Sequence, residues 1–173
     1  MKTMNFQAAI FTMIVLVSCH KEAASFNQDF TVEKYIEQLK ANQYNTTGLP
    51  EFTYRDIPML LQYRNDTTRI SKIPVNPISS FYQPECSLGM IVLWTIESIR
   101  AVANNSEQLI GRFPSQNPIL TYRVSDEFRV IQTVESQKIA AKAYFDWWES
   151  NKLKNFDAFK NIDPLRSTEF KWH

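Results

Sequence analysis

In the predicted folded part of this sequence, the side chains that could take part in catalysis are carboxylates. Glu97 lies in the most apolar segment of the chain, three residues before Arg100. A carboxyl group in such a segment could act as a general acid, whereas the i, i+3 spacing favours an ordinary ion pair. Glycoside hydrolysis would also need a second carboxylate, and no spacing selects among Glu85, Asp126 and Glu135. We therefore expect a buried ion pair and no enzymatic activity.

The small numbers of histidine, cysteine and glycine residues exclude most other chemistry. The two histidines, His20 and His173, lie outside the predicted folded body. A Ser-His-Asp or Cys-His arrangement, a histidine metal site and a cysteine-rich zinc site are therefore excluded there. Only 3 glycines are present, and they form neither a dinucleotide-binding GxGxxG run nor a P-loop. We expect no metal and no cofactor.

Aromatic side chains offer the best candidate for a binding surface. Trp147 and Trp148 are adjacent, so on a helix their side chains point about 100° apart. One of them should belong to the core and the other to an edge or interface. Trp148, with Tyr144 and Phe145, is the expected patch for binding a partner, and the alternative is that these rings only pack in the core.

Composition and charge limit the kind of partner. The chain has 173 residues, 44% of them hydrophobic, which is enough for one domain with a sizeable core. The combination of 12 Phe, 7 Tyr and 4 Trp with 3 Gly favours bulky packing between helices. Removal of residues 1–18 takes away Lys2 and leaves 18 basic and 18 acidic side chains. No net charge remains to attract nucleic acid or an anionic surface.

The N-terminus has the pattern of an export signal. Lys2 precedes an apolar run at residues 8–17, which is too short to span a bilayer. The run ends in Leu16-Val17-Ser18-Cys19, which resembles the lipobox of bacterial lipoproteins. The resemblance implies cleavage before Cys19 and its acylation, by palmitate among other chains, so that membrane lipid is a partner. The alternative is an ordinary cleaved signal with a chance cysteine.

Lipidation of Cys19 would leave Cys86 as the only thiol, so no intramolecular disulfide would be possible. Cys86 is expected in the first turn of a helix, as a small buried apolar group. The alternative is a reactive thiolate stabilised by the helix N-terminus.

The helices that would position these residues follow from apolar spacing and capping residues. A central helix, apolar on nearly all sides, is predicted from about residue 85 to residue 103. Further helices are predicted at residues 32–43 after Thr31, 57–63 after Asp56, 107–113, 134–151 and 156–162. Residues 65–82 and 119–130 are irregular and could contain short strands. These elements predict an all-α, irregular bundle of about five to six helices around the central helix, with a weak likeness to α-repeat proteins.

The predicted organisation has four parts. They are a lipoprotein signal peptide (1–18), a lipid-anchored tether (19–30), a helical domain (31–165) and a frayed tail (166–173). Within the domain, Asp66-Thr67-Thr68 resembles the signal at which Bacteroidetes O-glycosylate exported proteins, which implies modification of Thr67. The alternative is a loop in which Asp66 simply caps the backbone.

Taken together, several segments resemble a family of small, uncharacterised lipoproteins of gut Bacteroidetes. They are the lipobox, Asp56–Leu61, Pro74–Pro77 and Leu93–Arg100. The resemblance implies an exported domain anchored to the outer membrane, on its periplasmic or surface face, and brings no activity with it.

Three functional hypotheses follow from the sequence. The first is a macromolecule-binding or accessory module with an unidentified protein or glycan partner. The second is a carbohydrate-binding or carboxylate-dependent glycan-active protein. The third is an immunity-type lipoprotein that neutralises a toxin.

Overall fold

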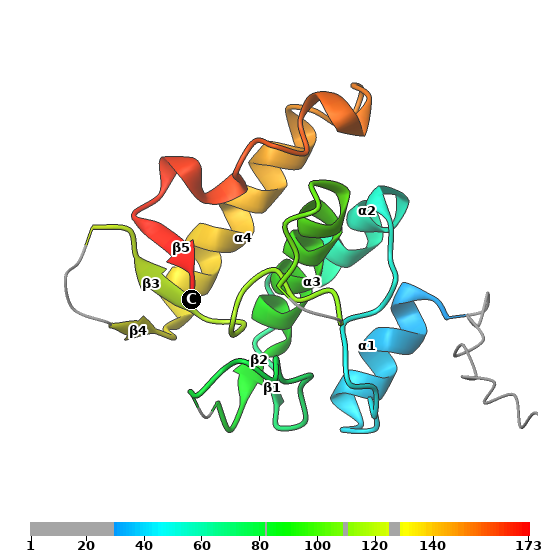
Figure 1. The fold of residues 1–173 in the computed structure, drawn as a ribbon, viewed down its shortest axis with the longest axis vertical. Helices are drawn as coiled ribbons and strands as arrows, with labels where there is room; N and C mark the ends of the chain where they lie inside the picture. Colours follow the sequence, from blue (N-terminus) through cyan, green and yellow to red (C-terminus); the bar gives the residue numbers. More distant parts are fainter. Residues whose placement is uncertain (1–29, 82, 109–110, 125–128) are drawn as a thin grey trace, which may run out of the picture.

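The computed structural model describes residues 30–81, 83–108, 111–124 and 129–173, and every structural statement below concerns these residues. They form a mixed α/β fold (Figure 1). The helices are α1 (Val32–Lys40), α2 (Ile57–Leu60), α3 (Leu88–Ala103) and α4 (Val134–Glu149). Single 3₁₀ turns are η1 (Tyr54–Asp56), η2 (Leu61–Tyr63), η3 (Phe156–Ala158) and η4 (Pro164–Ser167). The strands are β1 (Arg69–Ile70), β2 (Cys86–Ser87), β3 (Leu120–Tyr122), β4 (Val130–Ile131) and β5 (Phe170–Trp172).

Helix α3 is the centre of the molecule, as its all-round apolar sequence predicts. Thirteen of its sixteen residues are buried, and Figure 1 shows α4 on one side of it and α1 and α2 on the other. Gly89 permits the close approach of its neighbours, because a Cβ at this position would collide with the Gln137 side chain and the Arg64 carbonyl. The helix begins at Leu88, three residues later than expected.

Capping explains where α1 and α4 begin. The Thr31 hydroxyl accepts a hydrogen bond from the Lys34 amide at 3.3 Å. Thr133 and Ser136 form a reciprocal capping box at the start of α4. Both helices begin where the sequence predicts, and each ends two or three residues early. Asp56, by contrast, makes no capping bond to α2; its carboxylate accepts from the Thr53 amide and completes the capping box of η1.

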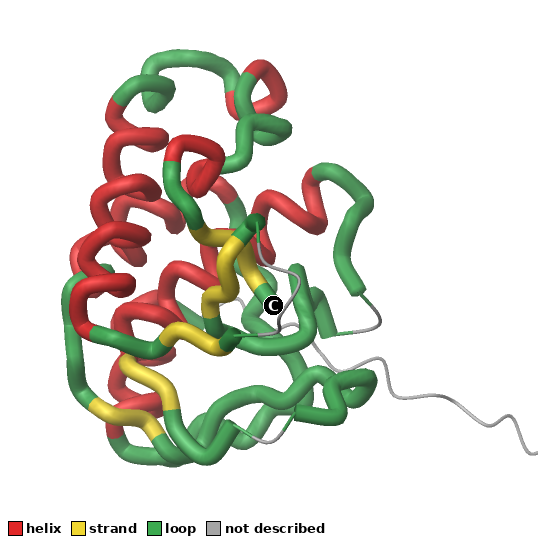
Figure 2. The backbone as a smooth tube through the Cα atoms, turned by 90° about the vertical axis from the view of Figure 1, so that its left-hand side faces the viewer, coloured by secondary structure: helices red, strands yellow, loops and turns green. Residues whose placement is uncertain are grey.

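The prediction of an all-α fold is wrong, because the chain also forms two small antiparallel sheets (Figure 2). One pairs β1 with β2, and the other has the strand order β4-β3-β5. In the second sheet, Leu120 faces Ile131 on one side and Trp172 on the other. These strands are two or three residues long, too short for an alternating pattern to show in the sequence. Their pairing depends on segments that are far apart in the chain.

Several further expectations about the elements are corrected. Residues 166–173, expected as a frayed tail, contain β5, which pairs with β3. The expected helix at 107–113 does not form among its described residues, because Gln108 and Phe113 pair in an isolated antiparallel bridge. The helix expected at 156–162 contains only η3. Four helices with intervening strands therefore replace a bundle of five to six, and there is no α-repeat arrangement in the described chain.

None of the helices in the described residues has the length and apolar content needed to cross a membrane.

Candidate functional site

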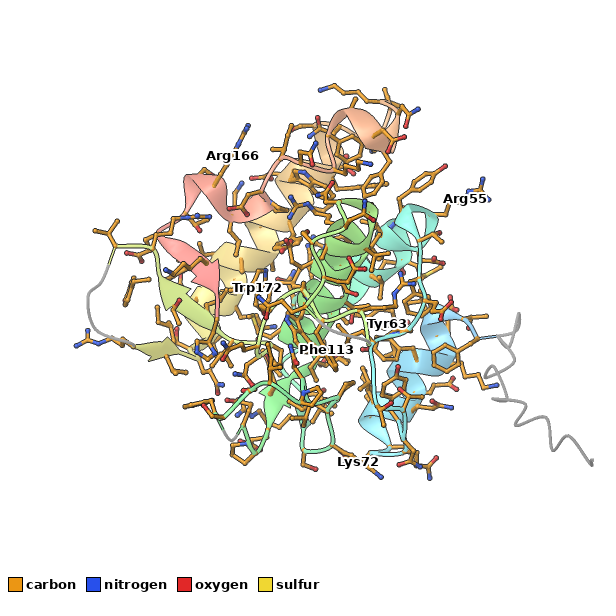
Figure 3. All side chains as sticks on the ribbon, viewed as in Figure 1. Arg55, Tyr63, Lys72, Phe113, Arg166 and Trp172 are labelled. Atoms are coloured by element: carbon orange, nitrogen blue, oxygen red, sulfur yellow. The ribbon has the colours of Figure 1, made fainter. Side chains whose placement is uncertain are left out.

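Glu97 and Arg100 meet two other side chains in what we call the buried polar cluster: Glu97, Arg100, Tyr144 and Trp172. The Arg100 Nη1 group lies 2.6 Å and 2.7 Å from the two Glu97 carboxylate oxygens. The Tyr144 hydroxyl donates to Glu97 Oε2 at 2.5 Å, and the Trp172 indole N–H donates to the Tyr144 hydroxyl at 2.8 Å. The cluster thus joins α3, α4 and β5, to which Trp172 belongs (labelled in Figure 3).

The cluster is closed, since its members satisfy one another. Arg100 is 5% exposed, and its Nε donates to the Lys160 carbonyl at 3.0 Å. Burial, and then the neighbouring Glu97, holds the pKa of the Tyr144 hydroxyl well above its usual value. Such an arrangement is suited to fixing three elements together.

The carboxylates considered as partners for Glu97 lie elsewhere. Glu85 forms a surface ion pair with Arg69 at 2.7 Å, and Glu135 is exposed in the first turn of α4. Asp126 lies outside the described residues. Glu97 therefore has the surroundings of a structural ion pair, with neither of the two described candidates beside it.

The expected aromatic patch is divided between the core and the surface. Tyr144 is fully buried, and Trp148 is half-buried against Trp147 and Phe159. Phe145 is at the surface, where the Arg64 guanidinium lies 4.3 Å from the centre of its ring. Trp147 is the core member of the tryptophan pair and Trp148 the more exposed one, which agrees with the prediction that the two adjacent rings are divided between core and edge. Trp148, Tyr144 and Phe145 do not form one accessible surface.

Cys86 is an inert buried thiol. It lies in β2 instead of the first turn of α3, and its thiol donates to the Pro118 carbonyl at 3.4 Å. Burial raises the pKa of the thiol to about 12, so the nucleophilic thiolate is scarce at neutral pH. The adjoining cavity has a volume of about 90 Å³, small for an organic ligand.

The other predicted modification and metal positions can be placed as follows. Thr67 is exposed in the loop between η2 and β1, where Asp66 Oδ1 accepts from the Thr68 amide at 2.9 Å. Cys19 and His20 lie outside the described residues. No cluster of three or more potential metal ligands occurs within the described part of the chain. Thr67 thus has the accessibility that O-glycosylation requires.

The structure contains an open hollow that the sequence did not reveal, which we call the aromatic groove. It lies at the C-terminal end of α3, has a volume of about 430 Å³ and falls within the usual size of ligand-binding pockets. Its lining is mainly apolar: Phe52, Tyr54, Ile99, Val102, Ala103 and Phe156, with Glu51, Thr53 and Arg112.

Tyr54 is the most accessible ring of the aromatic groove. Its side chain is 43% exposed and stacks on Phe156, with 5.3 Å between ring centres and 15° between ring planes. The capping box of Thr53 and Asp56 fixes the turn that carries Tyr54. The next residue, Arg55, points outward in Figure 3, 5.8 Å from the Tyr54 ring centre. A rigid turn therefore presents an aromatic face and a cation together.

Arg112 forms the polar side of the aromatic groove. Its backbone adopts a left-handed conformation with φ of 64°, and the preceding Gly111 has φ of 118°. Its Nη2 donates to the Phe52 carbonyl at 2.9 Å, whereas its buried Nε has no hydrogen-bond partner among the described residues. Burial lowers the pKa of this guanidinium, which nevertheless stays charged at neutral pH. Residues held in sparsely populated backbone conformations cluster at binding and active sites, which makes Arg112 a candidate member of such a site.

The aromatic groove was missed because four separate segments build it. Residues 51–54, the end of α3, Arg112 and Phe156 are not related by any helical or strand spacing. The only local signal is Tyr54-Arg55 in a turn before Pro58, and this alone is no sign of a pocket.

Comparison with known proteins places the chain in an uncharacterised family, as predicted, and does not bear on whether its members are Bacteroidetes lipoproteins. The model of a family described as DUF4943, a domain of unknown function, matches residues 27–173. No curated protein and no solved structure matches the chain. Because the family match covers nearly all of the chain, the protein belongs to the DUF4943 family of proteins with a domain of unknown function.

Proposed function

We propose that the protein is an exported lipoprotein, anchored to the outer membrane through acylated Cys19, that binds a protein partner in the aromatic groove. The proposed location at the outer membrane rests on the apolar run at residues 8–17 and the segment Leu16–Cys19. The binding function rests on one observation, the open apolar hollow around Tyr54 and Phe156.

A protein partner suits the lining of the aromatic groove better than a sugar or a nucleic acid does. Tyrosine and arginine are the residue types that contribute most binding energy at protein interfaces, and here Tyr54 and Arg112 border an apolar floor. A glycan-active cleft would hold two carboxylates and an exposed tryptophan, but this groove has Glu51 alone and no tryptophan. The partner is expected to insert an apolar or aromatic side chain.

This proposal keeps the idea of an accessory binding module but changes its surface. Tyr144 is part of the buried polar cluster and is unavailable to a partner. Trp148 packs on Phe159 and retains only partial exposure. Tyr54 is consequently the first side chain to remove when the binding surface is tested.

Cross-linking from position 54 tests the binding function. A photoreactive phenylalanine analogue at Tyr54, in the intact lipoprotein on cells, should cross-link a defined protein. Tyr54→Ala should weaken the binding of that protein at least about 30-fold, which corresponds to about 2 kcal/mol. The control is Val75→Ala, at an aliphatic side chain that is 61% exposed and does not line the groove. Equal affinity of the Tyr54→Ala and Val75→Ala proteins would show that the groove is not the binding surface.

Mass spectrometry of the purified protein tests the proposed lipid anchor separately. We expect a mature chain that begins at Cys19 and carries acyl groups, and a Cys19→Ala protein that leaves the membrane fraction. The anchor is strong because each buried methylene contributes about 0.8 kcal/mol. A mature protein with an unmodified Cys19 would contradict the lipoprotein proposal without affecting the groove.

A further inference from the structure

The turn between α4 and η3 holds an apolar side chain fully in solvent. Leu153 is 96% exposed, although leucine is normally buried. The turn is held by backbone bonds from Lys152 to the Trp148 carbonyl at 2.8 Å and from Lys154 to the Asn151 carbonyl at 2.8 Å. Figure 1 shows this segment, in orange, projecting at one end of the molecule. Leu153 is thus presented outward by a hydrogen-bonded turn.

Two lysines flank Leu153 in the sequence and bring cations beside the apolar tip. The Lys152 amine lies 2.6 Å from Glu149 Oε2, and the Lys154 amine donates to Asn151 Oδ1 at 2.8 Å. A further pair in this region joins Lys160 and Asp157 at 2.8 Å. Three lysines and two acidic residues thus leave residues 149–160 with a net charge of +1.

Below this tip the molecule is aromatic. Trp148 is half-buried against Phe159, and Asn151 donates from its side chain to the Trp147 carbonyl at 2.7 Å. Leucine, tryptophan and lysine are the residue types that peripheral proteins place at the interface of a bilayer.

We propose that the Leu153 loop, residues 150–155, contacts the surface of an anionic lipid bilayer. Leu153 enters the acyl region, while Lys152 and Lys154 lie at the level of the lipid phosphates. A single aliphatic side chain between lysines offers little area to a folded protein, whereas a bilayer accepts it in any rotational orientation. The contact would fix the orientation of the domain relative to the membrane.

The predicted anchor makes this contact geometrically feasible, and here the inference rests on the proposed function. The described chain begins at Phe30, which stacks on Phe52 with 6.1 Å between ring centres. Cys19 precedes Phe30 by eleven residues, which span at most about 36 to 40 Å when extended. An anchor at Cys19 therefore holds Phe30 within this distance of the bilayer and keeps the domain close to the lipid.

A polarity-sensitive fluorophore on a Leu153→Cys variant tests the contact. The mature acylated protein is reconstituted into vesicles of phosphatidylethanolamine and phosphatidylglycerol. Cys86 is buried and therefore does not compete for the label. The matched control is Val124→Cys, because Val124 is also 96% exposed and lies in a different part of the chain, just after β3. We expect a blue-shifted, brighter signal at position 153 and a water-like signal at position 124.

Lipid charge and the two lysines sharpen the test. One lysine near an anionic surface strengthens partitioning about fivefold. Lys152→Gln with Lys154→Gln should therefore lower the ratio of inserted to free loop by up to about 25-fold, and vesicles of phosphatidylcholine alone should lower it similarly.

Three results would overturn the proposal. In the first, the label at position 153 stays as exposed to water as the label at position 124. In the second, the label at 153 shows a blue shift that depends on neither the lipid charge nor the two lysines. In the third, the blue shift appears only when membrane proteins are added. The last would assign the loop to a protein partner. Flotation of the protein with the vesicles reports the anchor independently, so failure of the anchor is distinguished from failure of the loop.

Discussion

Two arginines of this molecule occupy opposite kinds of environment. Arg100, in the buried polar cluster, bonds to both Glu97 oxygens and to the Lys160 carbonyl. Arg112, at the aromatic groove, bonds to the Phe52 carbonyl and leaves its Nε without a partner among the described residues. The first lies in a regular helix and the second in a left-handed backbone conformation.

The difference indicates that the buried polar cluster contributes to the stability of the fold and the aromatic groove to binding. In the cluster, every charge is matched inside the molecule, so nothing is gained by an added ligand and much is lost when one member is removed. In the groove, apolar surface and the exposed Tyr54 ring remain accessible to an added side chain. Substitutions in the cluster should therefore change stability, whereas substitution of Tyr54 at the groove should change binding.

Removal of Glu97 should have the largest effect and tests the cluster directly. Glu97→Ala leaves Arg100 buried without its counterion and Tyr144 without its acceptor, which should cost about 3 to 5 kcal/mol in the free energy of unfolding. Urea denaturation followed by circular dichroism measures this. The control is Glu33→Ala, at an exposed position on α1. Replacing Glu97 and Arg100 together by methionine should recover most of the loss, and a double variant as unstable as the single one would contradict the ion-pair explanation.

Loss of the Tyr144 hydroxyl should have an intermediate effect. Tyr144→Phe keeps the ring but leaves the Trp172 indole N–H without its acceptor and Glu97 with one donor fewer. We expect a loss of about 1 to 3 kcal/mol in the free energy of unfolding. Tyr54→Phe is the matched control in the groove, since no hydrogen bond of its hydroxyl is needed for the stack on Phe156. Equal losses in the two variants would remove the distinction between the regions.

Alkaline pH should reduce the difference in stability between the wild type and Tyr144→Phe. The pKa of Tyr144 is raised in the folded state, first by burial and then by Glu97, above the unfolded value of 10.0. The stabilisation is fully present below pH 10 and is lost as the pH rises toward the folded pKa, because only the unfolded state releases the proton there. Between pH 10 and 11 the wild type should lose about 1 kcal/mol more than Tyr144→Phe. Urea denaturation at each pH measures this. If the free energies of unfolding of the two proteins changed in parallel with pH, ionisation of Tyr144 would not be the cause of the loss.

Substitution of Arg112 should have the smallest effect on stability. Asparagine tolerates the left-handed backbone better than most residues, so Arg112→Asn should compensate in part for the lost bond to Phe52. The expected change in the free energy of unfolding is below about 1 kcal/mol, measured in the same denaturation series. Arg100→Asn is the comparison and should cost several times more. A destabilised Arg112→Asn would mean that this cation supports the fold as Arg100 does.

The sequence could predict the parts of the fold that depend on neighbours in the chain. The helices after Thr31 and Thr133, the all-round burial of α3 and the division of Trp147 and Trp148 between core and edge follow from spacing within one helix. The pairing of Glu97 with Arg100 also lies within one helical turn. These features are local, so the amino-acid pattern contains them.

The remaining features depend on contacts between distant segments. Tyr144 meets Trp172 only because β5 lies beside α4, and β5 in turn exists because Leu120 pairs with Trp172. The aromatic groove needs four segments to converge. Strands of two or three residues and converging loops leave no periodic signal in the sequence. The sequence therefore predicted an all-α domain and missed both sheets.

The pairing of β3 with β5 has a consequence for the order of events in folding. Leu120 pairs with Trp172, and the chain between them includes all of α4. Pairing between segments this far apart carries a loop-closure entropy that a helix, which forms from local contacts, does not. We therefore expect the sheet to close after α4 has formed, and the hydrogen bond from Trp172 to Tyr144 to form in the same late step.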